Sequence, residues 1–156
     1  MQKTLHTLSE LESEAQNFAR TLIPKDATAT LVTLSGELGA GKTAFTKALA
    51  SALGVEETVT SPTFVLEKIY LLPENLGNAV SEASAFKRLI HIDAYRLKSG
   101  EELSALGFDA VMRESGNLVM LEWPERVADV LRIPAVAITL VSHPDDSREI
   151  SYKKYD

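Results

Sequence analysis

One octet in the chain has the residue types and spacing that bind phosphate. It reads Gly36-Glu37-Leu38-Gly39-Ala40-Gly41-Lys42-Thr43 and matches the pattern G-x-x-x-x-G-K-[ST] at every fixed position. Glycine lets backbone N–H groups turn inward and approach an anion without a Cβ in the way. We expect Lys42 to reach the β- and γ-phosphates of a nucleotide, and the Thr43 hydroxyl to take one position on Mg²⁺. The residues expected to bind the nucleotide are Glu37, Leu38, Gly39, Ala40, Gly41, Lys42, Thr43 and Ala44.

The segments on either side of the octet suit the elements that such a loop requires. Residues 30–35 form a short apolar and β-branched run that is typical of a buried strand. After the octet, apolar residues recur at helical spacing as far as Gly54, which stands where a helix-terminating glycine belongs. Strand, glycine-rich loop and helix therefore occur in the order of a nucleotide site. This order favours a nucleotide-binding loop over an ordinary glycine-rich turn.

Two further predicted strands each end in an acidic residue. Residues 88–93 lead to Asp93, and the apolar run 118–122 leads to Glu122. In an open parallel sheet the ligand lies beyond the carboxyl ends of the strands, so either acid can serve as the second Mg²⁺ anchor beside Thr43. The other acid is then available to orient the attacking water. His91 alternates with the apolar positions, which is compatible with a place in the core, on the surface or in the site, and packing is the preferred interpretation.

A hydroxyl-rich segment follows the predicted loop helix. It contains Ser61-Pro62-Thr63-Phe64, and Pro62 holds Ser61 in an extended conformation that forbids a helix across the segment. Nucleotide hydrolases often place a γ-phosphate sensor between the loop helix and the next strand. Thr63 is the candidate for such a switch, and an ordinary proline turn is the alternative.

Two more helices are predicted from capping boxes, in which a Ser and a Glu three residues later satisfy free N–H groups. The first pairs Ser9 with Glu12 and ends before Pro24, and the second pairs Ser99 with Glu102. Further strands are expected over residues 3–8, 64–72, 136–141 and 149–152, the last two as a hairpin, and a short helix is expected at 124. These elements predict an α/β fold of the P-loop NTPase type, a central and mainly parallel sheet flanked by helices, with antiparallel strands at one edge.

Composition limits the functions that the chain can have. It has 156 residues, no cysteine and a net charge of −6, so disulfides and thiolate chemistry are excluded. We expect one domain over residues 1–156, a cytoplasmic location and no membrane segment. Basic residues are scattered along the chain, so contact with nucleic acid is expected to run through a partner.

Four blocks in the chain occur in the order found in a known family. They are residues 36–43, Ser61-Pro62-Thr63-Phe64, His91-Ile92-Asp93-Ala94-Tyr95-Arg96-Leu97 and Glu122-Trp123-Pro124-Glu125. Together they resemble the bacterial TsaE family, also called YjeE. The first block is generic, whereas the combination of the other three is far more specific.

The resemblance implies a small ATPase that uses ATP and Mg²⁺ and is required for N6-threonylcarbamoyladenosine at position 37 of tRNAs reading codons that begin with A. It implies an accessory subunit that binds the TsaD and TsaB proteins and meets tRNA only indirectly. By position, Lys42 and Thr43 belong to the phosphate loop and Thr63 to the switch. The resemblance also implies that Asp93 and Glu122 are the metal and catalytic acids, and that Trp123, beside the second acid, either positions the site or contacts a partner.

The chain departs from the family pattern over residues 72–87, which are longer than usual and are expected to form a surface insertion. No arginine finger is evident, since Arg96 and Arg126 lie near the motifs but can equally pair with acids, so slow intrinsic hydrolysis is expected. The alternatives are a nucleotide-dependent adaptor without catalysis and, with less support, a small-molecule kinase, since residues 73–85 lack the Arg or Lys of a kinase lid. Adenine is favoured because the guanine-reading Asn-Lys-x-Asp pattern is absent.

Overall fold

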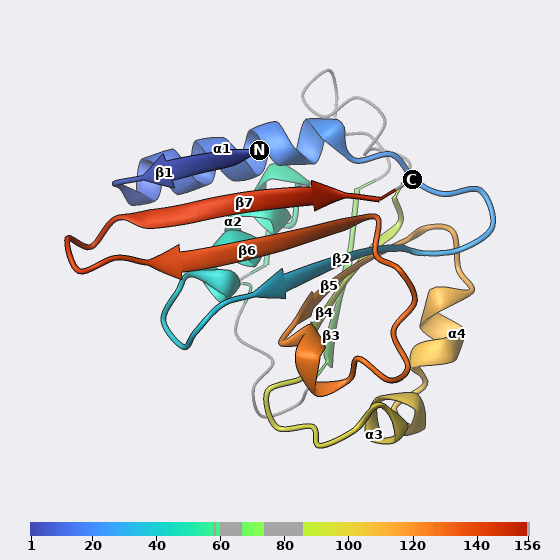
Figure 1. Ribbon diagram of the computed structural model, residues 1–156. Coiled ribbons are helices and arrows are strands. Elements are labelled where there is room, and N and C mark those ends of the chain that lie inside the picture. The colour runs from blue at the N-terminus through green and yellow to red at the C-terminus, as the bar shows by residue number, and fades with distance from the viewer. Residues whose placement is uncertain (58, 60–66, 74–85, 156) are drawn as a thin grey trace.

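A seven-stranded sheet forms the centre of the computed structural model, which describes residues 1–57, 59, 67–73 and 86–155 (Figure 1). In chain order the strands are β1 (Gln2–Leu5), β2 (Thr30–Ser35), β3 (Glu67–Leu71), β4 (Arg88–Asp93), β5 (Asn117–Glu122), β6 (Val136–Ser142) and β7 (Arg148–Lys154). The helices within the described residues are α1 (Leu8–Thr21), α2 (Lys42–Ala52), α3 (Gly100–Ala105) and α4 (Phe108–Met112), together with the 3-10 turn η3 (Pro124–Arg126). Their order across the sheet is β1-β7-β6-β2-β5-β4-β3.

The centre of the sheet is parallel and both of its edges are antiparallel. Strands β6, β2, β5 and β4 are parallel neighbours. Strand β3 pairs antiparallel with β4, while β7 pairs antiparallel with both β6 and β1. The predicted α/β fold class is confirmed, including the final hairpin. The antiparallel strands lie at two edges rather than one, because strand order depends on long-range pairings that no local pattern encodes.

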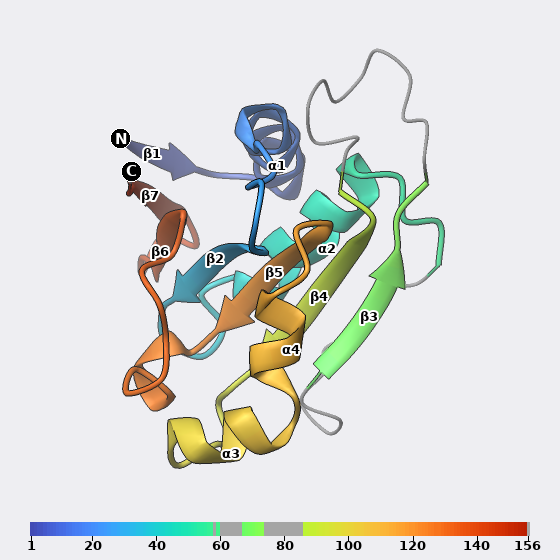
Figure 2. The same cartoon turned by 90° about the vertical axis from the view of Figure 1, so that its right-hand side faces the viewer.

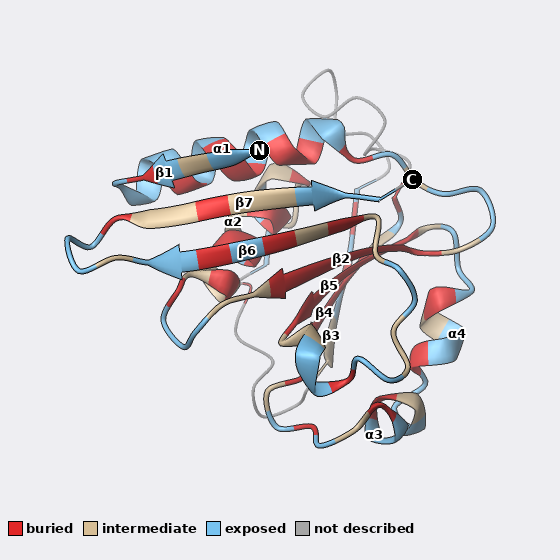
Figure 3. Ribbon diagram, in the orientation of Figure 1, coloured by how far each residue is buried: buried red, intermediate tan, exposed pale blue. Residues whose placement is uncertain are grey.

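Side chains of the central strands alternate between two apolar layers. Leu118 and Met120 of β5 pack in the layer that holds the apolar faces of α1 and α2. Val119 and Leu121 pack in the opposite layer with α3 and α4. Figure 2 shows these helix pairs on opposite sides of the sheet, and Figure 3 shows β2, β4 and β5 buried along their length. Because strand side chains alternate, Glu122 continues the Leu118 and Met120 series and faces the α2 side.

The capping pattern predicted for α1 is shifted by two residues. Thr7, and not Ser9, is the N-cap, and its Oγ1 accepts a hydrogen bond of 3.1 Å from the Glu10 backbone N–H. The sequence holds two overlapping matches to the same pattern, and the earlier one, Thr7 with Glu10, is the one used. The helix ends at Thr21, before Pro24 as predicted.

The predicted helix around Ser99 is divided in two. Ser99 is the N-cap of α3 but makes no side-chain capping bond, while the Glu102 carboxylate accepts from the Lys98 N–H at 3.2 Å. Gly107, with a φ of 86°, then separates α3 from α4, a helix that the apolar spacing does not predict.

Several sequence predictions lie outside the described residues. They are the switch segment with Thr63, the first part of the strand predicted over 64–72, and most of the insertion predicted over 72–87. The single-domain assignment stays a prediction. Among the described helices, none has the length and apolar character needed to cross a membrane.

Candidate nucleotide site

A cavity of about 410 Å³ opens where the phosphate loop meets the carboxyl ends of β4 and β5. The loop and the first turn of α2 form one wall. The remaining lining comes from Asp93, Tyr95, Glu122, Trp123 and Arg148. This is the position at which open α/β sheets bind ligands.

The phosphate loop takes a backbone conformation that depends on glycine. Gly36, Gly39 and Gly41 have φ values of 151°, 80° and 106°. A Cβ on Gly36 would lie 2.4 Å from the carbonyl oxygen of Leu140, so only glycine fits against β6. Gly41 is also the N-cap of α2 and has no side chain to cap it, so the free N–H groups of the first turn are available to an anion.

Lys42 is buried, and its ammonium group is held at the loop. Its Nζ donates to the carbonyl oxygens of Gly36 at 2.5 Å and Glu37 at 2.9 Å, and lies 4.3 Å from the centre of the Trp123 ring. Burial lowers the pKa of Lys42, and the negative charges of Glu122 and Asp93, among others, oppose that shift. The carbonyl oxygens and the ring therefore hold a cation that, among the described residues, has no anionic partner in direct contact.

Glu122 links the loop helix to a buried histidine. Thr43 Oγ1 lies 3.1 and 3.2 Å from the two carboxylate oxygens of Glu122, and His91 Nε2 lies 2.5 Å from Oε2. His91 is 0% exposed and Glu122 is 2% exposed. Packing is the preferred prediction for His91, with a place in the site as an alternative, and its ring is the partner of the candidate catalytic acid. The signal was its place two residues before Asp93, which puts both side chains on the same face of β4.

Asp93 lies beside Glu122 because β4 and β5 pair in register at these two residues. Its Oδ1 accepts a hydrogen bond of 3.0 Å from the Tyr95 N–H, which turns the chain sharply at the end of β4. Both acids thus reach the loop side of the sheet, as the sequence predicts, and both line the cavity.

Trp123 closes the cavity opposite the loop. It has a φ of 60°, rare for a bulky residue, and its N–H donates to the Leu34 carbonyl at 3.1 Å. Its ring lies 4.9 Å from that of Tyr95, and the Arg126 guanidinium lies over both rings. Arg126 therefore supports the aromatic wall, and it is not among the residues that line the cavity.

The structure brings most of the predicted site residues together. Leu38, Gly39, Gly41, Lys42, Thr43, Ala44, Asp93 and Glu122 all line the one cavity. Of the remaining loop residues, Glu37 contributes its carbonyl to Lys42. Ala40 is buried under the loop. Arg148 of β7, which belongs to none of the sequence motifs, also lines the cavity.

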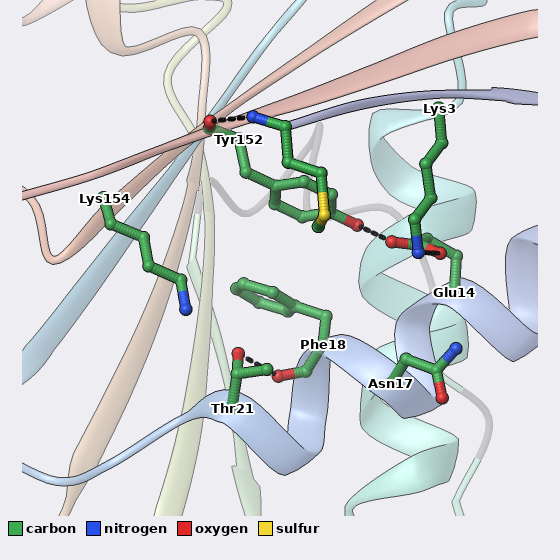
Figure 4. A pocket seen from close by; sticks show the side chains of 8 residues that line it. Lys3, Glu14, Asn17, Phe18, Thr21, Tyr152 and Lys154 are labelled. Atoms are coloured by element: carbon green, nitrogen blue, oxygen red, sulfur yellow. Dashed lines mark hydrogen bonds and ion pairs between the residues drawn. The ribbon is translucent and has the colours of Figure 1, made fainter.

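A second cavity, of about 420 Å³, lies between α1 and β7 (Figure 4). Its lining is mostly apolar, but it includes the buried carboxylate of Glu14. That carboxylate accepts from Lys3 Nζ at 2.9 Å and from Tyr152 OH at 2.8 Å. Burial and the negative charge of Glu14 raise the pKa of Tyr152 well above its usual range. None of the residues around this cavity belongs to the phosphate loop, so we assign the nucleotide chemistry to the first cavity.

Comparison with known proteins shows the family to which this chain belongs. Residues 6–150 match the sequence model of the family described as "Threonylcarbamoyl adenosine biosynthesis protein TsaE". The chain belongs to the TsaE family. The TsaE protein of Rickettsia typhi is 34% identical over 97% of this chain and 93% of its own. The TsaE protein of Treponema pallidum is 38% identical over 78% of this chain and 79% of its own.

A solved structure is similar over the whole TsaE-family chain. The crystal structure of Bacillus subtilis YdiB superposes with a TM-score of 0.74 and 28% identity, covering 100% of this chain and 86% of that one. The curated relatives are named tRNA threonylcarbamoyladenosine biosynthesis proteins. The family and fold expected from the four sequence blocks are both confirmed.

Proposed function

We propose that this TsaE-family chain binds and hydrolyses Mg-ATP as an accessory subunit in the formation of N6-threonylcarbamoyladenosine at position 37 of tRNAs reading ANN codons. One observation carries the proposal. Lys42, Thr43 and two acidic strand ends, Asp93 and Glu122, converge on one cavity at the N-terminus of α2. The pathway is inferred from the names of the relatives cited above, which refer to the biosynthesis of this tRNA nucleoside.

The phosphates are placed by the loop and its helix. The N–H groups of the first turn of α2 give a site for the β- and γ-phosphates, where the partial positive charge of the helix start favours an anion. Lys42 Nζ, which contacts two loop carbonyls and the Trp123 ring, would hold phosphate oxygens of the bound nucleotide. Removal of this buried cation leaves the phosphate charge without its main counter-charge.

The oxygen atoms near Thr43 suit a magnesium ion. Thr43 Oγ1 already lies within 3.2 Å of both carboxylate oxygens of Glu122, and Mg²⁺ prefers one or two protein oxygens together with phosphates and water. Thr43 with Glu122 or Asp93 would hold the ion, which when bound neutralises charge on the phosphates. The acid that does not hold the ion would be available to orient the attacking water. His91 Nε2 contacts Oε2 of Glu122 and so helps to fix this carboxylate beside Thr43.

Hydrolysis is proposed to be slow in the isolated chain. Efficient phosphoryl transfer requires a cation on the developing charge at the γ-phosphate. Arg126 lies over aromatic rings, and Arg148 is bound to loop carbonyls. We propose that binding to the TsaD and TsaB proteins completes the site. With a net charge of −6, the chain is suited to meet tRNA through such partners and not by itself.

The experiment is phosphate release from ATP by the purified chain, alone and with TsaD and TsaB. Parent protein is compared with Glu122→Gln and Asp93→Asn, and with the exposed-acid control Glu125→Gln. Two results together support the proposal. Hydrolysis rises when the partners are added, and Glu122→Gln and Asp93→Asn each lower hydrolysis more than they lower ATP binding. Tight ATP binding with no turnover in any mixture would leave a nucleotide-dependent adaptor, and full turnover in both acid variants would overturn their assignment.

A further inference from the structure

The hairpin of β6 and β7 lies against the outer side of the phosphate loop. Gly36 packs against the Leu140 carbonyl of β6. From β7, Arg148 Nε donates to the carbonyl oxygen of Ala40 at 3.1 Å, and Nη2 donates to that of Gly39 at 3.3 Å. The stem of Arg148 lies so close to Gly41 that a Cβ there would meet its Cδ and Nε at 3.3 Å.

The direction of the Arg148 side chain follows from the pleat of β7. Ile150, two residues on, is buried in the layer that holds α1 and α2, and Tyr152, two further on, stacks on Phe18 of α1. Arg148 belongs to the same series and so points to the side of the sheet on which α2 begins. Pairing of Arg148 with Leu5 of β1 and Ser142 of β6 fixes its position on both sides.

The turn before Arg148 is itself held by hydrogen bonds. Ser147 donates from both its N–H and its hydroxyl to Asp145 Oδ1, at 3.0 and 2.5 Å. The His143 N–H donates to the Ser147 carbonyl at 2.9 Å, which closes the hairpin. Arg148 therefore reaches the loop from a rigid element, and its planar guanidinium group is suited to two acceptors at once.

We propose that Arg148 is a positioning residue that holds the phosphate loop in its anion-binding conformation. In a trans peptide the C=O of one residue and the N–H of the next point in opposite directions. With the Ala40 carbonyl drawn outward to Arg148, the Gly41 N–H points away from β7, toward the side where a phosphate binds. Arg148 thus acts on phosphate binding through the loop backbone, without a role as an arginine finger.

The test uses Arg148→Met, which keeps an apolar stem against Gly41 but removes every donor. Arg148→Lys keeps the charge and a single donor group, and Arg132→Met is the control at an exposed arginine. The first measurement is amide hydrogen exchange over residues 36–44 in the nucleotide-free protein. We expect faster exchange in Arg148→Met, partial recovery in Arg148→Lys and parent behaviour in Arg132→Met.

The second measurement is nucleotide affinity, which rests on the proposed function. If the binding-competent loop falls to about a tenth of the population, the dissociation constants for ATP and ADP both rise roughly tenfold, because the two ligands share the loop. Unchanged exchange over residues 36–44 in folded Arg148→Met overturns the inference. Failure of the parent itself to bind nucleotide overturns the proposed function and leaves the exchange result to decide the role of Arg148.

Discussion

The pair of His91 and Glu122 makes a prediction that involves no nucleotide. His91→Leu replaces the ring by an apolar side chain of similar size. The Glu122 carboxylate, which is 2% exposed, then loses its contact to His91 and keeps its contact to the Thr43 hydroxyl. A hydrogen bond to a charged group contributes about 1.5–3 kcal/mol, and a buried charged group that loses a partner carries a further desolvation cost. We therefore expect a loss of about 3 kcal/mol in the free energy of unfolding.

The assay is denaturant and thermal unfolding without nucleotide. A loss of that size lowers the Tm of a chain of this length by roughly 6–12 °C. His143→Leu is the matched control, because His143 faces Glu149 at 3.7 Å with 40% of its side chain exposed, and such a pair contributes under about 1 kcal/mol. His91→Gln retains an N–H donor and recovers part of the loss. Equal stability of His91→Leu and His143→Leu would refute the argument that the ring supports the acid.

Three other predictions concern backbone, burial and pH. Gly36→Ala lowers the free energy of unfolding by about 2–4 kcal/mol and weakens ATP binding. Gly39→Ala has open space at its Cβ, so it lowers the free energy of unfolding by about 1–2 kcal/mol because of its positive φ alone. Unfolding curves measure both losses. Tyr152→Phe removes the hydrogen bond to buried Glu14 and lowers stability by about 1.5–3 kcal/mol, and a loss no larger than that of an exposed tyrosine variant would contradict this. Burial raises the pKa of Glu67 above its usual 4.5, so the folded state binds more protons than the unfolded state between the two values. Stability from this group therefore falls as pH rises from 4.5 through the folded pKa, and Glu67→Gln removes that slope in a pH series of unfolding curves.

The phosphate loop and the two acids could be predicted because their chemistry is local. The octet lies within one strand–loop–helix unit, and Asp93 and Glu122 each end an apolar run. The carboxyl ends of parallel strands lie at the same end of a sheet. The two acids could therefore be expected near the loop without knowledge of the exact strand order. The shift of the α1 cap from Ser9 to Thr7 is a choice between two equal patterns, which the hydrogen bond from the Glu10 N–H decides.

Arg148 and His91 could not be assigned from the sequence, for a different reason. Arg148 reaches Gly39 and Ala40 across more than a hundred residues, and only the pairing of β6 with β2 places its hairpin beside the loop. His91 bonds to an acid on the neighbouring strand, so its partner depends on the register of β4 and β5. Pairings of this kind are set by the whole sheet. The role of Thr63 stays a prediction, because that residue lies outside the described part of the chain.

The central claim is that the cavity beside Lys42 binds the phosphates of ATP. The most direct measurement is a calorimetric titration of the purified chain with ATP in the presence of Mg²⁺, repeated for Lys42→Ala and for Lys47→Ala. Lys42 is buried at the loop, whereas Lys47 is exposed on the same helix, α2. The account predicts one ATP per chain for the parent and for Lys47→Ala, with binding lost in Lys42→Ala. Equal ATP affinity in all three proteins, or no binding by the parent, would contradict it.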